Sequence, residues 1–261
     1  MLNALFELRY SSPIIATAIH NGHYIRPELR ENLIISEADR KREEDPFTDI
    51  IIQSFENKIV VDTSRFEVEL NRARERAIYK TPDDCWGLEV WKRKLTEQEI
   101  EQSLAEYDDF YRRLDNAITE TIKSFGYAII LDVHAYNHRR LGPGKPFDSV
   151  DKNPQIILGT TNMPRTYLES IYKIQRKFQE NIYEGEKLDC RIDIKYPGGT
   201  MSRHLHRQFP GKVFSLAIEF KKTFMEEWSG ELYRDKLEDL ISALHSIVPL
   251  LKRDLIIDWE K

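Results

Sequence analysis

Short apolar runs, separated by longer polar stretches, dominate the hydrophobic pattern of this chain. Six of them have the length and composition of strands: 13–19, 58–62, 128–134, 155–158, 192–196 and 213–220. Most are apolar at nearly every position, which is typical of strands that are covered on both faces of a parallel sheet. We expect 192–196 to be an edge strand and 128–134 to be central.

Between these runs, the pattern changes to the period of a helix. Thr96 and Glu99 form a capping-box signature, and apolar residues then recur at spacings of three and four until Gly126. Shorter helices are predicted over 46–55, 164–182 and 232–253. This alternation predicts an α/β fold with a mostly parallel central sheet, and no linker divides residues 1–261, so we expect a single domain.

Two long polar stretches remain. Residues 28–44 are highly charged, and we expect them to form mainly a solvated face. Residues 137–150 contain Gly142-Pro143-Gly144 and predict a long, turn-rich loop on the active face of the sheet. Residues 197–200 predict a turn or a close approach between backbone segments.

Composition narrows the function classes. The chain has 41% hydrophobic residues, 32% charged residues and a formal charge of −5, which argues against nucleic acid as the main partner. No apolar run is long enough to span a membrane. Cys85 and Cys190 form no C-x-x-C pair, and no secretory signal precedes them, so we expect free thiols and a cytoplasmic location.

Histidines stand at the ends of two predicted strands. Asp132 and His134 close the 128–134 run and lie on one face of that strand, because side chains alternate. His20 closes the 13–19 run. Since ligands bind at the carboxyl ends of strands in α/β sheets, the sequence predicts one site that contains two imidazoles. A nearby carboxylate could fix the tautomer of a metal-binding histidine.

Acidic residues could complete a metal site. Glu43, Glu44 and Asp45 precede the helix predicted at Pro46, where negative charge also simply suits a helix N-terminus. Two imidazoles, one carboxylate and an open position make a catalytic zinc site, and a separate Glu is the usual general base. Glu219, near the end of an apolar strand, is the candidate for that base; the alternative is a structural ion pair.

Two further groups of residues have both a functional and a structural interpretation. Arg65 and Arg72 follow a strand, where anion-binding groups often lie, although surface arginines are usually only solvated. Trp86 and Trp91 could form a core hairpin or a lip over the substrate, and we favour the core.

Taken together, these motifs make the chain resemble the N-formylglutamate amidohydrolases, which look like distant relatives of zinc carboxypeptidases. The resemblance covers about residues 13–226. Its pieces, in order, are His20-x-Gly22, Asp45-x-x-x-Asp49, Ser64-Arg65, Glu69-Leu70-Asn71-Arg72, Val90-Trp91-x-x-x-Leu95, Leu131-Asp132-Val133-His134, Leu158-Gly159-Thr160, Gly198-Gly199-x-x-x-Arg203-His204 and Ile218-Glu219-Phe220-Lys221.

The resemblance implies a phosphorylase/hydrolase-like three-layer fold, with helices on both faces of a mixed sheet, and one zinc ion. It implies His20, Asp45 and His134 as metal ligands, with Glu44 as the competing carboxylate. The other implied residues are Glu219 as the base, Arg65 in a catalytic role, and Asn71, Arg72, Arg203 and His204 for substrate binding. The chain departs from the family pattern at Tyr111, Ala135, Lys221 and Lys222.

The expected function is therefore zinc-dependent hydrolysis of an N-acyl acidic amino acid such as N-formylglutamate. One alternative is a carboxypeptidase-like or deacylase activity on another acylated amino acid or short peptide. Another is a non-catalytic binding protein, which would have no need to keep His20, His134 and Glu219 together. The sequence leaves the oligomeric state open.

Overall fold

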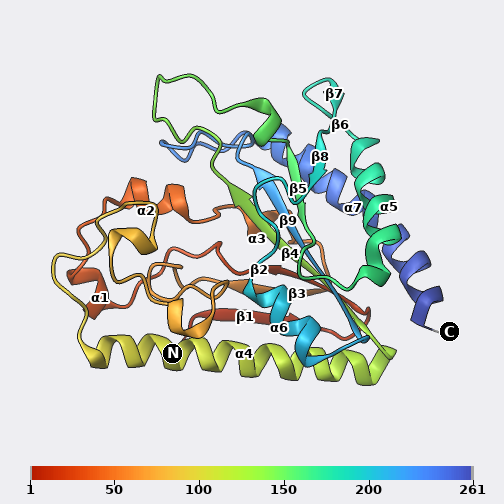
Figure 1. The fold of residues 1–261 in the computed structure, drawn as a ribbon, viewed down its shortest axis with the longest axis horizontal. Coiled ribbons are helices and arrows are strands. Elements are labelled where there is room, and N and C mark those ends of the chain that lie inside the picture. The colour runs from red at the N-terminus through yellow and green to blue at the C-terminus, as the bar shows by residue number, and fades with distance from the viewer. Residues whose placement is uncertain (1, 260–261) are drawn as a thin grey trace.

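A seven-stranded sheet forms the centre of the computed structural model, which describes residues 2–259 (Figure 1). Its strand order is β1-β3-β2-β4-β9-β5-β8, and β6 and β7 form a separate hairpin. The strands are β1 (Ala4–Leu8), β2 (Ile14–Ala18), β3 (Asn57–Val61), β4 (Ala128–Tyr136), β5 (Ile156–Gly159), β6 (Ile182–Tyr183), β7 (Glu186–Lys187), β8 (Cys190–Ile192) and β9 (Val213–Lys221).

The sheet is mixed but mostly parallel. Neighbouring strands pair in parallel from β3 through β2 and β4 to β9, and β5 pairs in parallel with β8. Only β1–β3 and β5–β9 are antiparallel. The chain leaves β2 towards β3 and later returns to the other side of β2 with β4. This reversal creates a crevice at the carboxyl ends of β2 and β4, where open α/β sheets bind ligands.

Helices cover both faces of the sheet, as predicted (Figure 1). The α-helices of the described residues are α1 (Pro27–Glu31), α2 (Glu37–Glu43), α3 (Thr48–Ile51), α4 (Glu97–Phe125), α5 (Leu168–Gln179), α6 (Thr200–Gln208) and α7 (Arg234–Trp259). Of these, α3 to α7 pack against the sheet. Single 3-10 turns lie at Arg74–Arg76, Pro82–Asp84, Val150–Lys152 and Arg165–Tyr167.

Alternation along the central strands produces two cores. Ile129 and Leu131 of β4 pack with α3, α5 and α7, whereas Ile130 faces the opposite way, with α4 and α6. Strand β4 is therefore apolar at nearly every position because both of its faces are buried. Asp132 and His134 share the face of Ile130 and interrupt this apolar core with polar groups.

The long helix matches its prediction closely. In α4, the Thr96 hydroxyl accepts from the backbone N–H of Glu99, and the Glu99 carboxylate accepts from the backbone N–H of Thr96. Gly126 ends the helix with φ of 83°. Two elements were not predicted. Edge strand β1 precedes the first predicted strand, and α6 begins at the end of the predicted turn 197–200, in a segment for which no element was predicted.

One other prediction was wrong. The helix expected over 46–55 forms only over α3, because Phe47 adopts a left-handed conformation with φ of 69° and interrupts it. The segment 28–44 is mostly exposed, as expected, but Arg40, Glu43 and Glu44 are buried. Within the described residues, no helix is long and apolar enough to cross a membrane. Both cysteines are free and buried.

We predict that Gly22 is a tight packing constraint on the turn that follows His20. A Cβ at Gly22 would lie 2.1 Å from the backbone carbon of Asp62, whereas one at Gly126 would meet nothing within 4 Å. Gly22→Ala should therefore destabilise the protein by about 3 kcal/mol or more, since neither backbone can yield cheaply. Gly126→Ala should cost only about 1–2 kcal/mol, from its left-handed conformation. Denaturant unfolding measures both, and equal losses would contradict the constraint.

Candidate metal centre

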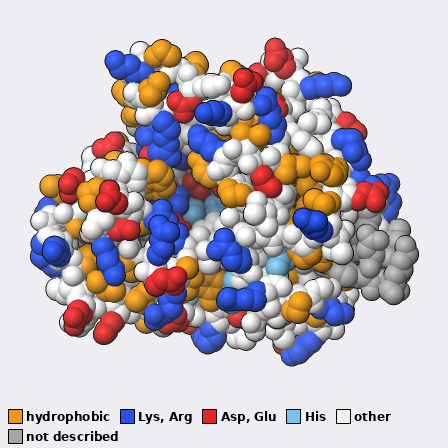
Figure 2. Space-filling model, viewed as in Figure 1, with side chains coloured by type: hydrophobic (Ala, Val, Ile, Leu, Met, Phe, Trp, Pro, Cys, Tyr) orange, Lys and Arg blue, Asp and Glu red, His pale blue; other side chains and the backbone are white. Residues whose placement is uncertain are grey.

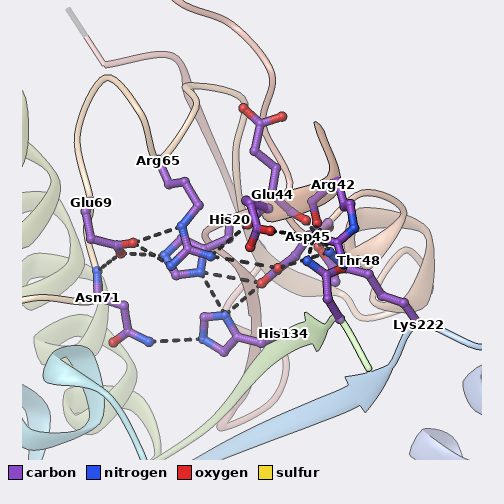
Figure 3. Close-up of polar contacts among 12 residues, drawn as sticks. His20, Arg42, Glu44, Asp45, Thr48, Arg65, Glu69, Asn71, His134 and Lys222 are labelled. Atoms are coloured by element: carbon purple, nitrogen blue, oxygen red, sulfur yellow. Dashed lines mark hydrogen bonds and ion pairs between the residues drawn. The ribbon is translucent and has the colours of Figure 1, made fainter. Parts of the chain in front are cut away.

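Two imidazoles meet at the crevice between β2 and β4. His20 follows the end of β2, His134 lies near the end of β4, and their Nδ1 atoms are 3.1 Å apart (Figure 3). The third member is Asp45. Its Oδ2 lies 3.4 Å from His20 Nδ1 and 3.2 Å from His134 Nδ1. All three side chains are at least 96% buried.

The backbone holds Asp45 in this position. Its N–H donates to the carbonyl of His20 at 2.8 Å, which ties the two loops together. Its own carbonyl accepts from the hydroxyl of Thr48 at 2.7 Å. Because the left-handed Phe47 separates Asp45 from α3, the carboxylate does not cap that helix and is directed at the histidines.

The spacing of these donor atoms fits a tetrahedral metal ion. With metal–ligand distances near 2.05 Å, neighbouring ligand atoms of a tetrahedral site are about 3.3 Å apart. The observed separations of 3.1, 3.2 and 3.4 Å lie close to that value. The spacing of His20, Asp45 and His134 therefore suits a shared metal ion.

Outer carboxylates orient both rings. Glu69 Oε1 lies 2.6 Å from His20 Nε2, and Asp132 Oδ1 lies 3.1 Å from His134 Nε2. Asp132 is itself held by the hydroxyl of Thr17 on β2. An Nε2 proton shared with each carboxylate leaves each Nδ1 lone pair facing Asp45, the tautomer that a metal ligand needs.

The electrostatics of the centre favour a bound cation. Burial alone would lower the pKa of His134, but Asp132 and Asp45 outweigh it and hold that pKa well above its usual value. Burial also opposes ionisation of Asp45, yet His134 and His20 hold the pKa of that carboxyl well below its usual range. An imidazole surrounded by carboxylates will bind a positive charge, whether a proton or a metal ion.

Glu44 lies outside this centre. Its carboxylate accepts from Ser64 and Arg40 and contacts His23, and it forms no hydrogen bond with His20 or His134 among the described residues. Of the two competing carboxylates, the structure brings Asp45 to the histidines and engages Glu44 elsewhere.

The centre opens into a cavity of about 180 Å³. Figure 2 shows this part of the surface hollowed, with histidine inside and Lys and Arg side chains around it. Glu219 lines the cavity because β4 and β9 pair His134 with Glu219, and register partners in parallel strands share a face. Burial raises the pKa of Glu219 to about 7, although His134 acts against this.

Cationic groups line the same cavity: Arg65, Arg72, Arg140 and Lys222. Arg65 uses all three guanidinium nitrogens, on Glu69 and on the carbonyl of Glu43. Arg72 stacks on the ring of Tyr79 and donates to the carbonyl of Asp84 at 2.6 Å. Asn71 places its amide nitrogen 3.3 Å from His134 Nε2.

The structure places three residues differently from what the sequence analysis favoured. Arg203 is exposed, and its side chain bonds only to Asn162 among the described residues. His204 pairs with Asp115 on α4 at 2.7 Å, and neither residue lines the cavity. Trp86 is not a core residue, since it is 45% exposed and lies on the cavity wall.

Sequence reasoning missed several cavity residues. Arg140 comes from the turn-rich segment 137–150, and Lys222 was noted only as a departure from the family pattern. Tyr196 closes the segment 192–196 that we predicted as an edge strand, but β8 ends at Ile192 and leaves Tyr196 in the following loop. Lys222 is 1% exposed, and its ammonium donates to the carbonyls of Arg42 and Glu44. The sequence signal that could have pointed to this cavity residue was a lysine placed just after an apolar strand.

Comparison with known proteins identifies the family of this chain. The family model for N-formylglutamate amidohydrolase matches residues 12–225. The chain belongs to this amidohydrolase family. Among curated proteins, none matches the sequence significantly.

Solved structures share the fold of this family member. An N-formylglutamate amidohydrolase from Ralstonia eutropha JMP134 aligns with a TM-score of 0.74 and 17% identity, over 97% of this chain and 99% of that one. A gene product from Agrobacterium tumefaciens aligns with a TM-score of 0.60 and 18% identity, over 91% and 92%. A metallo-carboxypeptidase from Burkholderia cenocepacia reaches a TM-score of only 0.35 at 14% identity, over 92% and 56%.

Glycines of the family-like motifs allow a side chain and a backbone segment to approach closely at the site. A Cβ at Gly199 would lie 2.0 Å from the Asn71 side-chain oxygen, and one at Gly159 would lie 2.6 Å from the backbone nitrogen of Gly198. Asn71 Oδ1 accepts from the backbone N–H of Met201 at 3.1 Å, which joins the start of α6 to the cavity wall. The motif glycines thus position Asn71 beside His134.

We predict that Asp45→Asn abolishes tight metal binding, because a neutral amide replaces the carboxylate between the two imidazoles. Glu44→Gln, one residue away and of matched chemistry, should keep metal affinity within a few fold. Calorimetric titration of the metal-free proteins with zinc measures the difference. Equal loss in both variants would mean that Glu44, or the loop as a whole, determines metal binding.

Proposed function

We propose that the protein is a zinc-dependent amidohydrolase that cleaves the amide of an N-acyl acidic amino acid, with N-formylglutamate as the first substrate to test. The observation that carries this proposal is the convergence of His20, Asp45 and His134 at the base of a cavity that also contains Glu219. Family membership supports the reaction class. The two free, buried thiols are compatible with the cytoplasmic location that we propose.

Zinc suits this donor set. Two imidazole nitrogens and one carboxylate oxygen, with a fourth position open to the cavity, are typical of catalytic zinc. When bound, the metal supplies Lewis acidity, which polarises the acyl carbonyl and makes water more acidic. Glu69 and Asp132 keep the rings of His20 and His134 in the tautomer that this requires.

Glu219 handles the proton transfers in the proposed mechanism. Its carboxylate accepts a proton from the attacking water as the C–O bond forms. It then delivers that proton to the amide nitrogen as the C–N bond breaks, and for an N-formyl substrate the products are formate and the free amino acid. A carboxyl with a pKa near 7 is suited to both steps.

The cationic wall binds and orients the substrate. We assign the α-carboxylate to Asn71 and Arg72, because Asn71 stands next to His134 and the Arg72 guanidinium can bind a carboxylate in a bidentate way. Arg65, at 4.0 Å from Asp45, is held rigidly by Glu69 and can stabilise negative charge that develops on the acyl oxygen.

We predict that Glu219→Gln lowers kcat on N-formylglutamate by roughly 10²- to 10⁴-fold, the usual contribution of a positioned general base. KM should change little, because the lost interaction belongs to the transition state. Zinc content and melting temperature should be retained. The control is Glu231→Gln, an exposed carboxylate outside the cavity, which should behave as the unmodified protein. A Glu219 variant that loses stability but keeps turnover would assign this residue a structural role.

A further inference from the structure

Arg140 is a cation of the cavity that the proposed mechanism leaves without a role. It comes from the loop after β4 that spans residues 137–149. Its Nη1 donates to both carboxylate oxygens of Glu43, at 2.7 and 2.8 Å. Its guanidinium also lies 5.6 Å from the centre of the Trp86 ring and interacts with the phenol of Tyr196.

The contact with Glu43 fixes Arg140 relative to the metal centre. Glu43 is only 5% exposed and stands two residues before Asp45. The loop after β4 is therefore anchored to the segment that supplies the carboxylate ligand. Trp86, on the same wall, is 45% exposed, so Arg140 lies towards the outer part of the cavity.

The cavity cations differ in what they have left to offer a ligand. Arg65 has a protein partner on every nitrogen, and the Lys222 ammonium is held by two buried carbonyls. Arg140 binds Glu43 through Nη1 alone, and its guanidinium also bonds the phenol of Tyr196. Because a guanidinium carries five N–H donors, part of its planar fork remains for a carboxylate. Arg72 forms no ion pair among the residues that the structure describes, and it too has donors to spare.

We propose that Arg140 determines specificity by binding the side-chain carboxylate of the acidic N-acyl amino acid, while Asn71 and Arg72 bind its α-carboxylate. This inference rests on the proposed function. In such a substrate the α-carboxylate is next to the scissile amide, and the side-chain carboxylate is several bonds farther away. Asn71 beside His134 and Arg140 towards the rim match that order.

Three ligands separate the two carboxylate sites. N-formylglutamate carries both carboxylates, N-formylglutamine keeps only the α-carboxylate, and N-formylisoglutamine keeps only the side-chain carboxylate. Their affinities are measured by calorimetry on zinc-loaded protein that carries Glu219→Gln, so that no ligand is consumed. Hydrolysis of the same compounds by protein with Glu219 intact is measured in parallel.

Arg140→Gln should weaken binding of N-formylglutamate and N-formylisoglutamine by roughly 10- to 100-fold, as expected for loss of a charge-assisted hydrogen bond. Its effect on N-formylglutamine should be far smaller. Arg72→Gln should weaken N-formylglutamate and N-formylglutamine instead. The matched control is Arg139→Gln, because Arg139 stacks on Trp228 and pairs with Glu226 outside this cavity.

Equal weakening of all three ligands by Arg140→Gln, or the reverse pattern for Arg140 and Arg72, would overturn the assignment. Failure of all three compounds to bind would overturn it as well. If they bind with the expected pattern but none is hydrolysed, Arg140 keeps its role as a carboxylate-binding residue and the proposed reaction is wrong. Zinc content, measured for every variant, separates loss of the ligand site from loss of the metal.

Discussion

The burial of negative charge at the carboxyl ends of β2 and β4 is the constraint on which the rest of the structure depends. Asp45, Asp132 and Glu69 are buried around two imidazoles, and the half-buried Glu219 faces them from the cavity. Isolated carboxylates at such a place would cost several kcal/mol each, so they require positive partners. Arg65 and Lys222 supply part of that positive charge. The ligand atoms of His20, Asp45 and His134 are spaced so that a metal ion could supply the rest.

Strand periodicity made the centre of this site predictable. Alternation along 128–134 puts Asp132 and His134 on one face, and the apolar runs around them identify the strands that meet there. These are local properties of a few consecutive residues, and the fold class follows from them together with the capped helix α4. The β4–β9 register then brings Glu219 beside His134 without any further assumption.

Partners that are distant in sequence could not be predicted in the same way. The charged segment 28–44 has the composition of a solvated surface, yet Arg40 and Glu44 neutralise each other in the interior. Nothing in the sequence marks the left-handed Phe47 that shortens α3, and β1 is a partly exposed edge strand with a weak apolar signal. Arg140 and Trp86 lie in segments without periodicity, so only tertiary structure shows that they share a wall.

The three consecutive acids at positions 43–45 each contact a different set of residues. Glu43 anchors Arg140, Glu44 is enclosed by Arg40, Ser64 and His23, and Asp45 faces the imidazoles. Because each contact depends on the position of its acid in the segment, inserting or deleting one residue would place a different side chain at each of these three sites. The length of this segment is therefore under tighter restraint than its composition. Natural or engineered changes in size are better accommodated in the exposed part of the loop after β4, beyond Arg140.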